Sequence, residues 1–507
     1  GKSQNWFVVG SSLFAASVSS STLMGHSGEG FISGIAVFNY NVGAIFVIIF
    51  VSLFFLPFYI KSGIYTIPEY LGRRFDNRSR KYFSFITIIG NVFLDAGAAL
   101  YTGALILKII FPEIDMMWII IGMALMAGTY TIIGGLSSAI NADMIQSIIL
   151  IAGSVLLSIF CFNSVGGWEN FVEHFHDGVW LNLIRPNSDT TVPWFSIFLS
   201  IPILGFYFWG NNQVIVQRVM SAKTVNEGRL GFLFVAFLYV FTLFIFIAPG
   251  MVGRMIDLFG VGDTLPNEII DGNTLRAQYG IDTNEVYPRL ILKLLPVGLI
   301  GVMIACMVSA LTSTLSATLS SVSTLFTMDF YKSWRPESSP RHLVRVGQWT
   351  SFITLVVAVL WAPLIGKFAS LVAYYQEFSS YLAPPIVGTF LVGLFWKGST
   401  RNGAFAGLMS GLAMSALIMT YKFGFGGVVP FHFLLWVPIL LILSVLVNII
   451  VSKCDRNKET DVETYTWNKS VWQDDTRELK TVPWYKNFRY ISIALIIIAL
   501  LEYWWFF

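Results

Sequence analysis

Charged side chains are scarce in this sequence. Only 12% of its 507 residues are Asp, Glu, Lys or Arg, whereas 55% are hydrophobic. Soluble domains carry about 25% charged residues, so a chain this apolar cannot cover a water-exposed surface. Its mean hydropathy of +0.69 points to lipid as the main solvent. The net charge of +3 is small and spread over loops, which gives no basis for a nucleic-acid partner.

Residues suited to catalysis or metal binding are also few. The chain has five histidines and three cysteines, and no Ser/His/Asp set or metal-spaced Cys/His cluster stands out among them. Two cysteines lie inside apolar runs and the third follows one, so we expect no disulfide framework. A Gly-rich motif with a phosphate-binding lysine is missing too. The sequence therefore predicts neither an enzyme nor an ATP-driven motor.

Long apolar runs fill most of the chain. A membrane-spanning helix needs about 20 mostly apolar residues, and about thirteen such runs follow one another. They lie at about 5–24, 35–60, 82–111, 117–136, 142–163, 194–212, 228–254, 289–325, 342–366, 370–396, 403–421, 431–452 and 487–507. The runs are apolar throughout instead of alternating, which disfavours a transmembrane β-barrel. We therefore expect an all-α, multi-pass membrane protein with about thirteen transmembrane helices.

Basic residues gather in every second loop. The segment 61–81 holds six Lys and Arg residues, and the loops after the sixth, eighth, tenth and twelfth runs are basic as well. The intervening loops are poor in basic residues, and 164–193 and 257–285 are rich in acids. Since basic loops stay in the cytoplasm, this pattern predicts a cytoplasmic N-terminus and an external C-terminus. The polar stretch at about 453–486 is then a cytoplasmic linker.

Hydroxyl side chains are concentrated in the first apolar run. Five of the six residues from 17 to 22 are Ser or Thr, and Gly25, Gly28 and Gly30 follow. This composition suggests a helix that breaks in the middle of the membrane and frees backbone carbonyls. Carbonyls and hydroxyls together suit a hard monovalent cation. Close packing of helices through small residues is the alternative explanation.

The eighth apolar run repeats this composition. Eight Ser and Thr residues lie between 309 and 321, and residues 310, 313 and 314 share one helical face. In an alternative interpretation, these hydroxyls bond back to their own helix. Two hydroxyl-rich segments in one membrane protein favour a shared cation site.

Three carboxylates fall within or at the edges of apolar runs. They are Asp95, Asp143 and Glu377. A carboxylate inside a membrane is costly, so its default interpretation is functional. Asp143 has the alternative of an interfacial residue near a helix start, and Glu377 that of a structural partner for a nearby donor.

Seven stretches, in order along the chain, carry a family resemblance. They are 1–3, 63–71, 134–137 with 143–146, 209–218, 295–298, 326–332 and 393–397. Here the sequence resembles the sodium/solute symporter family and, within it, the sodium/galactose and sodium/glucose cotransporters. The resemblance implies a core of five plus five inverted helices at 1–396, divided at about 5–163 and 194–396, that works by alternating access. It also implies three peripheral helices at 397–507 and a fourteenth helix upstream of residue 1.

The resemblance also implies a principal sodium site. Its ligands are carbonyls on the first core helix and a carbonyl with two hydroxyls on the eighth: Ala15, Val18, Ala310, Ser313 and Thr314. These positions coincide with the two hydroxyl-rich segments. Some relatives bind a second sodium ion at the positions of Asp143 and Ser316. Ala317 stands where those relatives have a serine, which puts the second site in doubt.

The implied solute pocket departs further from the family pattern. Its residues are Thr22, Asn41, Asp95, Trp209 and Gln376, with Tyr40 and Phe208 as gates. Sugar carriers of this kind have Gln or His at the position of Thr22, Glu at that of Asn41 and Lys at that of Tyr239. The galactose carrier has Asn at the positions of Asp95 and Gly205, and Phe208 replaces a gate tyrosine. The sodium site thus follows the family more closely than the pocket does.

The predicted function is symport, in which sodium drives the import of a small neutral polar solute. A monosaccharide or polyol is the leading solute, because Asp95 in the pocket and no lysine at 239 disfavour an anion. We expect a monomer in a cell membrane, a bacterial inner membrane, with Na⁺ as its only cofactor. Two alternatives stay open. One is symport of another solute, a carboxylate or an amine, and the other is a sodium-gated sensor that binds sugar without moving it.

Overall fold

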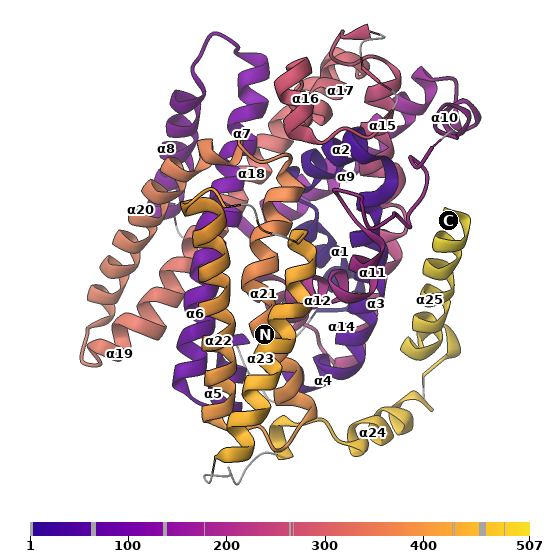
Figure 1. Ribbon diagram of the computed structural model, residues 1–507. Coiled ribbons are helices and arrows are strands. Elements are labelled where there is room, and N and C mark those ends of the chain that lie inside the picture. Colours follow the sequence, from indigo (N-terminus) through magenta and orange to yellow (C-terminus); the bar gives the residue numbers. More distant parts are fainter. Residues whose placement is uncertain are drawn as a thin grey trace.

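Helices make up nearly all of the computed structural model of the protein (Figure 1). The structure describes residues 4–61, 67–134, 139–176, 178–262, 265–266, 268–427, 429, 431–455, 463–480 and 482–506. Within these ranges, extended pairing is limited to two isolated bridges, Gln4 with Ala222 and Arg185 with Pro193. The helical class agrees with the prediction, because a helix bonds its own backbone polar groups away from water.

The first third of the chain differs from the prediction at its start. Its elements are α1 (Trp6–Ser17), α2 (Ser20–Ser33), η1 (Gly34–Val37), α3 (Phe38–Phe54), α4 (Leu56–Lys61), α5 (Ile67–Arg74), α6 (Asn77–Gly90), η2 (Asn91–Ala96), α7 (Gly97–Ile110), α8 (Met116–Gly134) and α9 (Ala139–Ser164). The run predicted at 5–24 is two helices that meet at Val18 and Ser19, and the second helix continues to Ser33. The break falls inside the hydroxyl-rich segment.

The middle of the chain contains several short helices and π-helical turns. Its elements are α10 (Trp168–Phe175), α11 (Trp194–Leu199), α12 (Ile201–Phe206), η3 (Tyr207–Asn211), α13 (Gln213–Val219), α14 (Val225–Tyr239), η4 (Leu243–Ile247), α15 (Ala248–Met255), α16 (Gly272–Tyr279), η6 (Thr283–Glu285), α17 (Val286–Leu294), α18 (Val297–Leu325), η7 (Phe326–Tyr331), α19 (Lys332–Trp334), α20 (Pro340–Ile365) and α21 (Leu371–Phe395). The turns η2, η3, η4 and η7 are π-helical. Such turns frequently mark functional sites, because they insert an extra residue into a helix.

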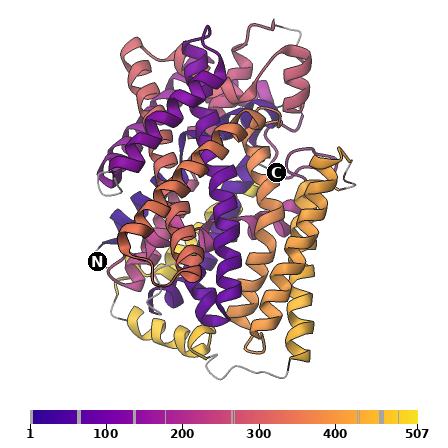
Figure 2. The ribbon, with the colours of Figure 1, turned by 90° about the vertical axis from the view of Figure 1, so that its left-hand side faces the viewer.

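Three long helices and a linker complete the chain. The elements are α22 (Arg401–Met419), η8 (Thr420–Gly424), α23 (Phe433–Cys454), η9 (Glu463–Tyr465), α24 (Lys469–Leu479), η10 (Trp484–Lys486) and α25 (Phe488–Trp505). Figure 2 shows α24 lying across one end of the bundle, between α23 and α25 in the chain. The predicted linker at 453–486 thus contains a helix of its own.

Nine helices of the described part are long and apolar enough to cross a membrane, and two bent helix pairs raise this number to eleven. Trp6–Ser17 and Met116–Thr129 are shorter apolar helices. The protein is therefore a multi-pass membrane protein. The count of thirteen stays a prediction, because breaks such as the one after α1 leave segments too short to be counted by length.

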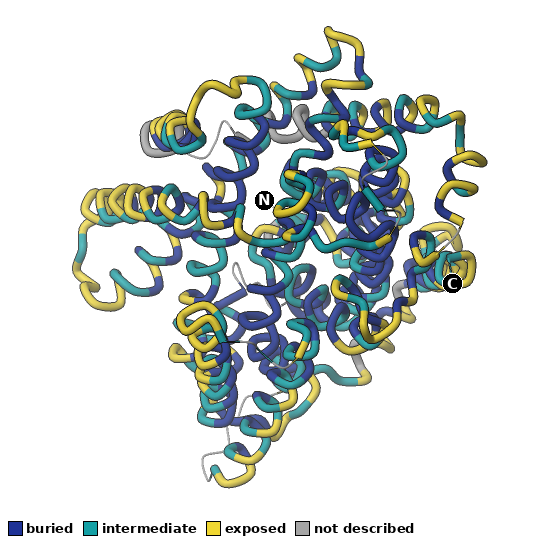
Figure 3. Tube along the Cα trace, turned by 45° about the horizontal axis from the view of Figure 1, so that its top comes forward, coloured by how far each residue is buried: buried dark blue, intermediate teal, exposed yellow. Residues whose placement is uncertain are grey.

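Helices differ strongly in how much of their surface other helices cover. In the most apolar windows of the α2–α3 segment and of α21, 83% of the residues are buried, against 22% in the α18–α19 segment and in α25. Figure 3 shows the exposed residues along the outer helices and the buried ones in the centre. Large apolar side chains such as Leu125, Trp349 and Leu360 are exposed. In a membrane, lipid would cover these side chains. The helices α2, α3 and α21, whose residues are mostly buried by other helices, form the centre of the bundle.

The two ends of the bundle carry opposite loop chemistry. In Figure 1, α10, α16 and α17 lie at the upper end, where the acidic segments 164–193 and 257–285 are. The elements α4, α5 and α24 lie at the lower end, where α5 and the start of α6 carry the basic residues between 73 and 81. By the positive-inside rule, the upper end is the predicted external face.

A buried ion pair attaches the linker helix α24 to the bundle. Arg229 of α14 bonds to Asp475 of α24 at 2.7 Å, and the two side chains are 2% and 5% exposed. The Nε of Arg229 also donates to the carbonyl of Ser52 at 3.0 Å, and its guanidinium lies 4.2 Å from the ring centre of Phe488. One arginine thus joins α3, α14, α24 and α25.

We expect Asp475→Ala to lower the thermal midpoint of the purified protein by several degrees, because Arg229 would stay buried without its counter-charge. Glu463→Ala is the matched control. Glu463 pairs with Lys397 at 2.8 Å in the same linker, but its side chain is 83% exposed. Exposed pairs contribute little to stability, so this control should melt like the wild type. Equal midpoints for the two variants, measured by scanning fluorimetry, would contradict an anchoring role for Asp475.

Candidate functional site

The break between α1 and α2 frees two backbone carbonyls. Ser19 Oγ accepts from the N–H of Thr22 at 3.2 Å, and the N–H of Ser19 donates to Thr22 Oγ1 at 3.4 Å. In a continuous helix, these two N–H groups would donate to the carbonyls of Val18 and Ala15, four residues earlier. This capping box satisfies the start of α2. It leaves the carbonyls of Ala15 and Val18 available to a ligand.

Two threonine hydroxyls in the hydroxyl-rich part of α18 bond to their own helix. Thr314 Oγ1 donates to the carbonyl of Ala310 at 2.9 Å, and Thr312 Oγ1 donates to Val308 in the same way. The alternative interpretation, in which the hydroxyls of this segment bond back to their own helix, is therefore correct for these two threonines. A hydroxyl that donates to a carbonyl still has lone pairs for a cation, so a bond of this kind is compatible with a cation site.

A buried hydrogen bond brings the break next to α18. Ser20 Oγ, in the first turn of α2, donates to the carbonyl of Met307 at 3.1 Å. Met307 lies one turn before Ala310, on the same helix as Ser313 and Thr314. Ala310 and Thr314 are thus joined by a hydrogen bond. The α1–α2 break contacts α18 at Met307, about one helical turn before Ala310.

The second predicted sodium site is only partly described. Asp143 belongs to α9, which packs against α18, but its side chain lies outside the described residues. Ser316 is buried on α18 at 7% exposure, whereas Ala317 is exposed.

A chain of polar contacts connects Thr22 with Asn41. His26 Nδ1 lies 3.0 Å from the carbonyl of Thr22, and His26 Nε2 lies 3.1 Å from Asn41 Oδ1. Asn41 Nδ2 then donates to Thr242 Oγ1 at 2.6 Å. The sequence prediction included Thr22 and Asn41 and missed His26. The available signal was spacing, because His26 follows Thr22 by four residues and shares its helix face.

Asp95 lies in the π-helical turn η2, surrounded by tyrosines. Its carboxylate is close enough to the hydroxyls of Tyr207, Tyr374 and Tyr375 to interact electrostatically with them. Within the part of the chain that the structure describes, Asp95 has no ion-pair partner and its side chain accepts no hydrogen bond.

Two of these tyrosines have unused hydroxyl groups. Tyr374 donates to the carbonyl of Phe93 at 2.8 Å and accepts from Trp361 Nε1 at 2.7 Å, so its hydroxyl is fully engaged. The hydroxyls of Tyr207 and Tyr375 make no hydrogen bond within the described ranges. Together with Asp95, they form a group of polar atoms from three helical segments that a solute could bridge.

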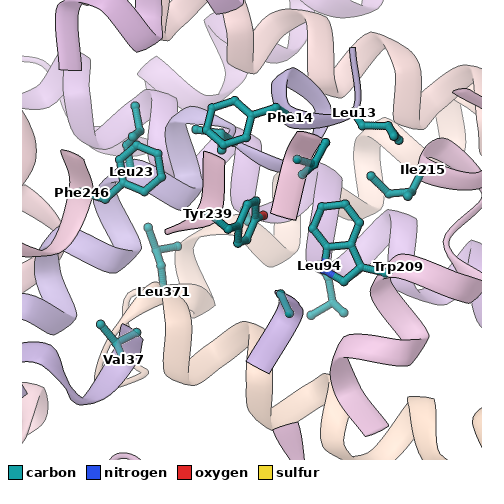
Figure 4. Close-up of a cluster of buried hydrophobic side chains, with 14 of the residues drawn as sticks. Leu13, Phe14, Leu23, Val37, Leu94, Trp209, Ile215, Tyr239, Phe246 and Leu371 are labelled. Carbon is teal, nitrogen blue, oxygen red and sulfur yellow. The ribbon is translucent and has the colours of Figure 1, made fainter. Parts of the chain in front are cut away.

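Trp209 lies in the packed centre of the bundle. Its side chain is 2% exposed, and its ring centre lies 5.4 Å from that of Tyr239 and 5.2 Å from that of Phe208. Figure 4 shows Trp209 in the same buried cluster as Tyr239, Leu94 and Ile215. In this conformation the predicted stacking surface is therefore covered, and Trp209 packs against Phe208, the predicted gate residue.

Tyr40 and Gln376 line a cavity of about 60 Å³ towards the predicted external face. Glu29 of α2 lines it too, is 5% exposed and accepts a short hydrogen bond from Ser370 Oγ. The prediction missed Glu29 because it fell between two apolar runs and resembled a loop residue. Since α2 continues to Ser33, Glu29 is in fact a buried helical carboxylate within the candidate span Ser20–Phe54.

Glu377, next to Gln376, has a structural partner. Its Oε1 pairs with Lys422 of η8 and accepts from the hydroxyl of Tyr381 at 3.3 Å. The side chain of Glu377 is only 10% exposed. The alternative considered for Glu377, a partner for a nearby donor, is the one that the structure supports.

Comparison with known families matches a model of the sodium:solute symporter family to residues 1–411. The chain belongs to this family. It is 32% identical over 491 residues to solute carrier family 5 member 4 of Rattus norvegicus, covering 89% of this chain and 72% of the relative. It is 31% identical over 488 residues to sodium/glucose cotransporter 1 of Oryctolagus cuniculus, covering 89% and 73%. The sodium/mannose cotransporter SLC5A10 of Bos taurus is 33% identical over 442 residues, covering 83% and 73%.

Two solved structures share the fold. A Na⁺-coupled sialic acid symporter in a substrate-bound, outward-open state superposes with a TM-score of 0.71 at 22% identity, covering 90% of this chain and 92% of that one. A nucleobase-cation-symport-1 family transporter in a closed conformation gives a TM-score of 0.52 at 13% identity, covering 91% and 95%. At these identities the likeness concerns the fold alone.

The comparisons confirm the predicted family and the coupling ion. Members of this family are symporters, which are not enzymes, and sodium is the coupling ion. The protein is therefore a multi-pass membrane transporter that uses sodium and a small-molecule solute.

Proposed function

We propose that the protein uses the sodium gradient to import a neutral monosaccharide or polyol. The observation that carries this proposal is the α1–α2 break, which frees the carbonyls of Ala15 and Val18 beside the hydroxyls of α18. Sodium binds to Ala15, Val18, Ala310, Ser313 and Thr314. Because both helices contribute ligands, bound sodium holds α1 and α18 together and stabilises one conformation over the other.

The solute binds on the other side of the break. Thr22, Asn41, Asp95 and Gln376 supply its hydrogen-bond donors and acceptors, Trp209 supports its apolar face, and Tyr40 and Phe208 are the gates. A polyhydroxylated neutral solute fits this set best, since amides both donate and accept whereas an ionised Asp95 only accepts. The sodium/glucose and sodium/mannose cotransporters among the relatives support a sugar.

The finer architecture is proposed on the same basis. The chain has about thirteen transmembrane helices, and residues 1–396 form an inverted-repeat core with halves at about 5–163 and 194–396. Residues 397–507 add three peripheral helices. The protein works as a monomer in a bacterial inner membrane.

Two other functions remain as outcomes of the test. The unpaired Asp95 among tyrosines favours symport of an amine as the second candidate. A sensor would bind sugar with sodium but would not accumulate it. Uptake of labelled glucose, galactose, mannose and polyols into proteoliposomes, with and without a sodium gradient, separates these cases. Before the uptake assay, a thermal-stability screen of the purified protein identifies the solute. It tests sugars, polyols, amines and acids, each with and without sodium.

We expect Asp143→Asn to change the sodium dependence of uptake and to leave the solute ranking as it is. The reason is its place on α9, which packs against the sodium-binding helix α18, far in sequence from the proposed solute residues. Sodium titrations of uptake and a solute competition series measure the two properties separately. A changed ranking with a normal sodium response would reverse this assignment.

A further inference from the structure

A small acidic cavity opens between the solute residues and the predicted external face. Its wall includes Glu29, Tyr40, Asp271 and Gln376, contributed by α2, α3, the segment before α16, and α21. Its volume of about 60 Å³ has room for roughly four to six water-sized groups. Cavities that enclose organic ligands measure about 300–1,000 Å³, so the occupant is small.

Glu29 offers an oxygen to this cavity. Ser370 Oγ donates to Oε1, and no further hydrogen bond to the carboxylate exists among the residues that are described. The other oxygen, Oε2, accepts no hydrogen bond within the described ranges, and Glu29 lines the cavity. The hydroxyl of Tyr40 and the side-chain amide of Gln376 likewise make no hydrogen bond within the described ranges, and both residues line the cavity.

No cationic side chain of the described residues neutralises Glu29. The neighbouring cations bind elsewhere: Arg185 to Ser33 and Asn182, Arg276 to Gly366 and Asp282, and Lys422 to Glu377. Among the described lining residues there is no Lys or Arg, whereas Asp271 adds a second negative charge. The carboxylate of Asp271 is occupied as the cap of α16, accepting from Asn273 and Thr274. Glu29 is thus the free anionic ligand of the cavity.

We propose that this cavity is an outer site for a monovalent inorganic cation, with Glu29 as its charged ligand. Carboxylate, phenol and amide oxygens are the hard donors that such an ion prefers. A divalent ion fits less well, because no group of three His, Cys, Asp or Glu side chains in the described chain could hold a metal. The inference rests on the proposed sodium-coupled function, in which sodium enters from this side. The outer site concentrates sodium near the mouth and orients Gln376 before the solute arrives.

The test measures binding of ²²Na⁺ to the purified protein by scintillation proximity. Thr314→Ala weakens the inner site, so its remaining sodium binding should come from the outer site. Adding Glu29→Gln to Thr314→Ala should remove this remainder. An unchanged sodium titration when Glu29→Gln is added to Thr314→Ala would overturn the outer site, because the weakened inner site alone would then account for the signal. Melting curves confirm that each variant is folded.

Transport gives a second, independent measurement. In an otherwise wild-type protein, Glu29→Gln should raise the sodium concentration for half-maximal uptake by roughly threefold to tenfold, with full uptake at saturating sodium. Ser370→Ala keeps the carboxylate and should retain ²²Na⁺ binding. Glu169→Gln is the matched control, because Glu169 is an exposed acid on α10 at the same end. If Glu169→Gln raised the sodium concentration for half-maximal uptake equally, the effect would come from general surface charge, and the outer site would be overturned.

The two proposals fail in different ways. If sodium drives no solute uptake by the wild type, the proposed function is wrong, while ²²Na⁺ binding to Thr314→Ala still reports on the outer site. If Glu29→Gln behaves like the wild type in both assays while Thr314→Ala loses sodium-dependent uptake, only the outer site is wrong.

Discussion

Thr314→Ala should abolish sodium-driven uptake at ordinary sodium concentrations, and Ser313→Ala should do the same. Each change removes one oxygen ligand from the proposed sodium site, for which we infer five ligands in all. Losing a hydrogen-bond-class ligand to a charge costs about 1.5–3 kcal/mol, which lowers sodium affinity roughly tenfold to hundredfold. Sodium titrations of labelled-solute uptake into proteoliposomes measure the shift, and ²²Na⁺ binding measures it without transport.

Thr312→Ala is the matched control for this prediction. Thr312 and Thr314 are the same residue type on the same helix, and each hydroxyl donates to the carbonyl four residues earlier at 2.9 Å. Two residues of helix turn the side chain by about 200°, so Thr312 faces away from the proposed ligands. The two variants should therefore melt alike, while only Thr314→Ala and Ser313→Ala change sodium dependence. An unchanged sodium response in both of these variants would reject the sodium site.

The sequence could predict that a helix breaks after α1, because polar side chains are costly in a membrane unless they cap a helix or bind a ligand. Five hydroxyls in six residues are costly against lipid and are acceptable where they cap a helix or bind an ion. Its extent was not predictable from the same residues. The stretch from Gly25 to Ser33 contains His26 and Glu29 and resembled a loop. It continues as a helix because its polar groups face protein, as when His26 contacts Asn41.

Contacts between residues far apart in the chain could not be predicted from this sequence alone. Asp95 stood out as a carboxylate in an apolar run, but its tyrosine neighbours at 207 and 375 lie more than 100 residues away in the chain. The π-helical turn η2 also left no clear signal, because its residues Asn91–Ala96 suit an ordinary helix as well. The cavity beside Glu29 is lined by five separate stretches of the chain, within 29–40, 190–192, 271–272, 369–376 and at 433, so it exists only in the folded protein.

Asp95→Asn should weaken binding of the native solute roughly tenfold to hundredfold, the loss expected for a hydrogen bond to a charged acceptor. The structure supports this expectation, since Asp95 lies in a π-helical turn and its carboxylate is unbonded within the described residues. Asparagine is also the residue that the galactose carrier has at this position. We therefore expect Asp95→Asn to shift preference towards galactose. Solute-dependent thermal shifts at saturating sodium, with competition uptake, measure both effects.

The tyrosines around Asp95 provide the internal check. If a solute bridges Asp95 and the free hydroxyls, Tyr207→Phe and Tyr375→Phe should each weaken the solute and lose part of their effect in the Asp95→Ala background. Tyr374→Phe is the matched control, because the hydroxyl of Tyr374 is already engaged with Phe93 and Trp361. It should lower stability more than solute affinity.

The outcome also decides between the candidate solutes. A cationic solute would pair with ionised Asp95, so Asp95→Asn would abolish its binding while a neutral sugar would still bind weakly. The exposed Glu113→Gln, in the loop between α7 and α8, controls for charge alone and should bind solute normally. Wild-type affinity for every solute in both Asp95→Asn and Asp95→Ala would place Asp95 outside the site. The solute pocket would then have to be built around Gln376 and Trp209, with Asp95 left as a structural neighbour of the tyrosines.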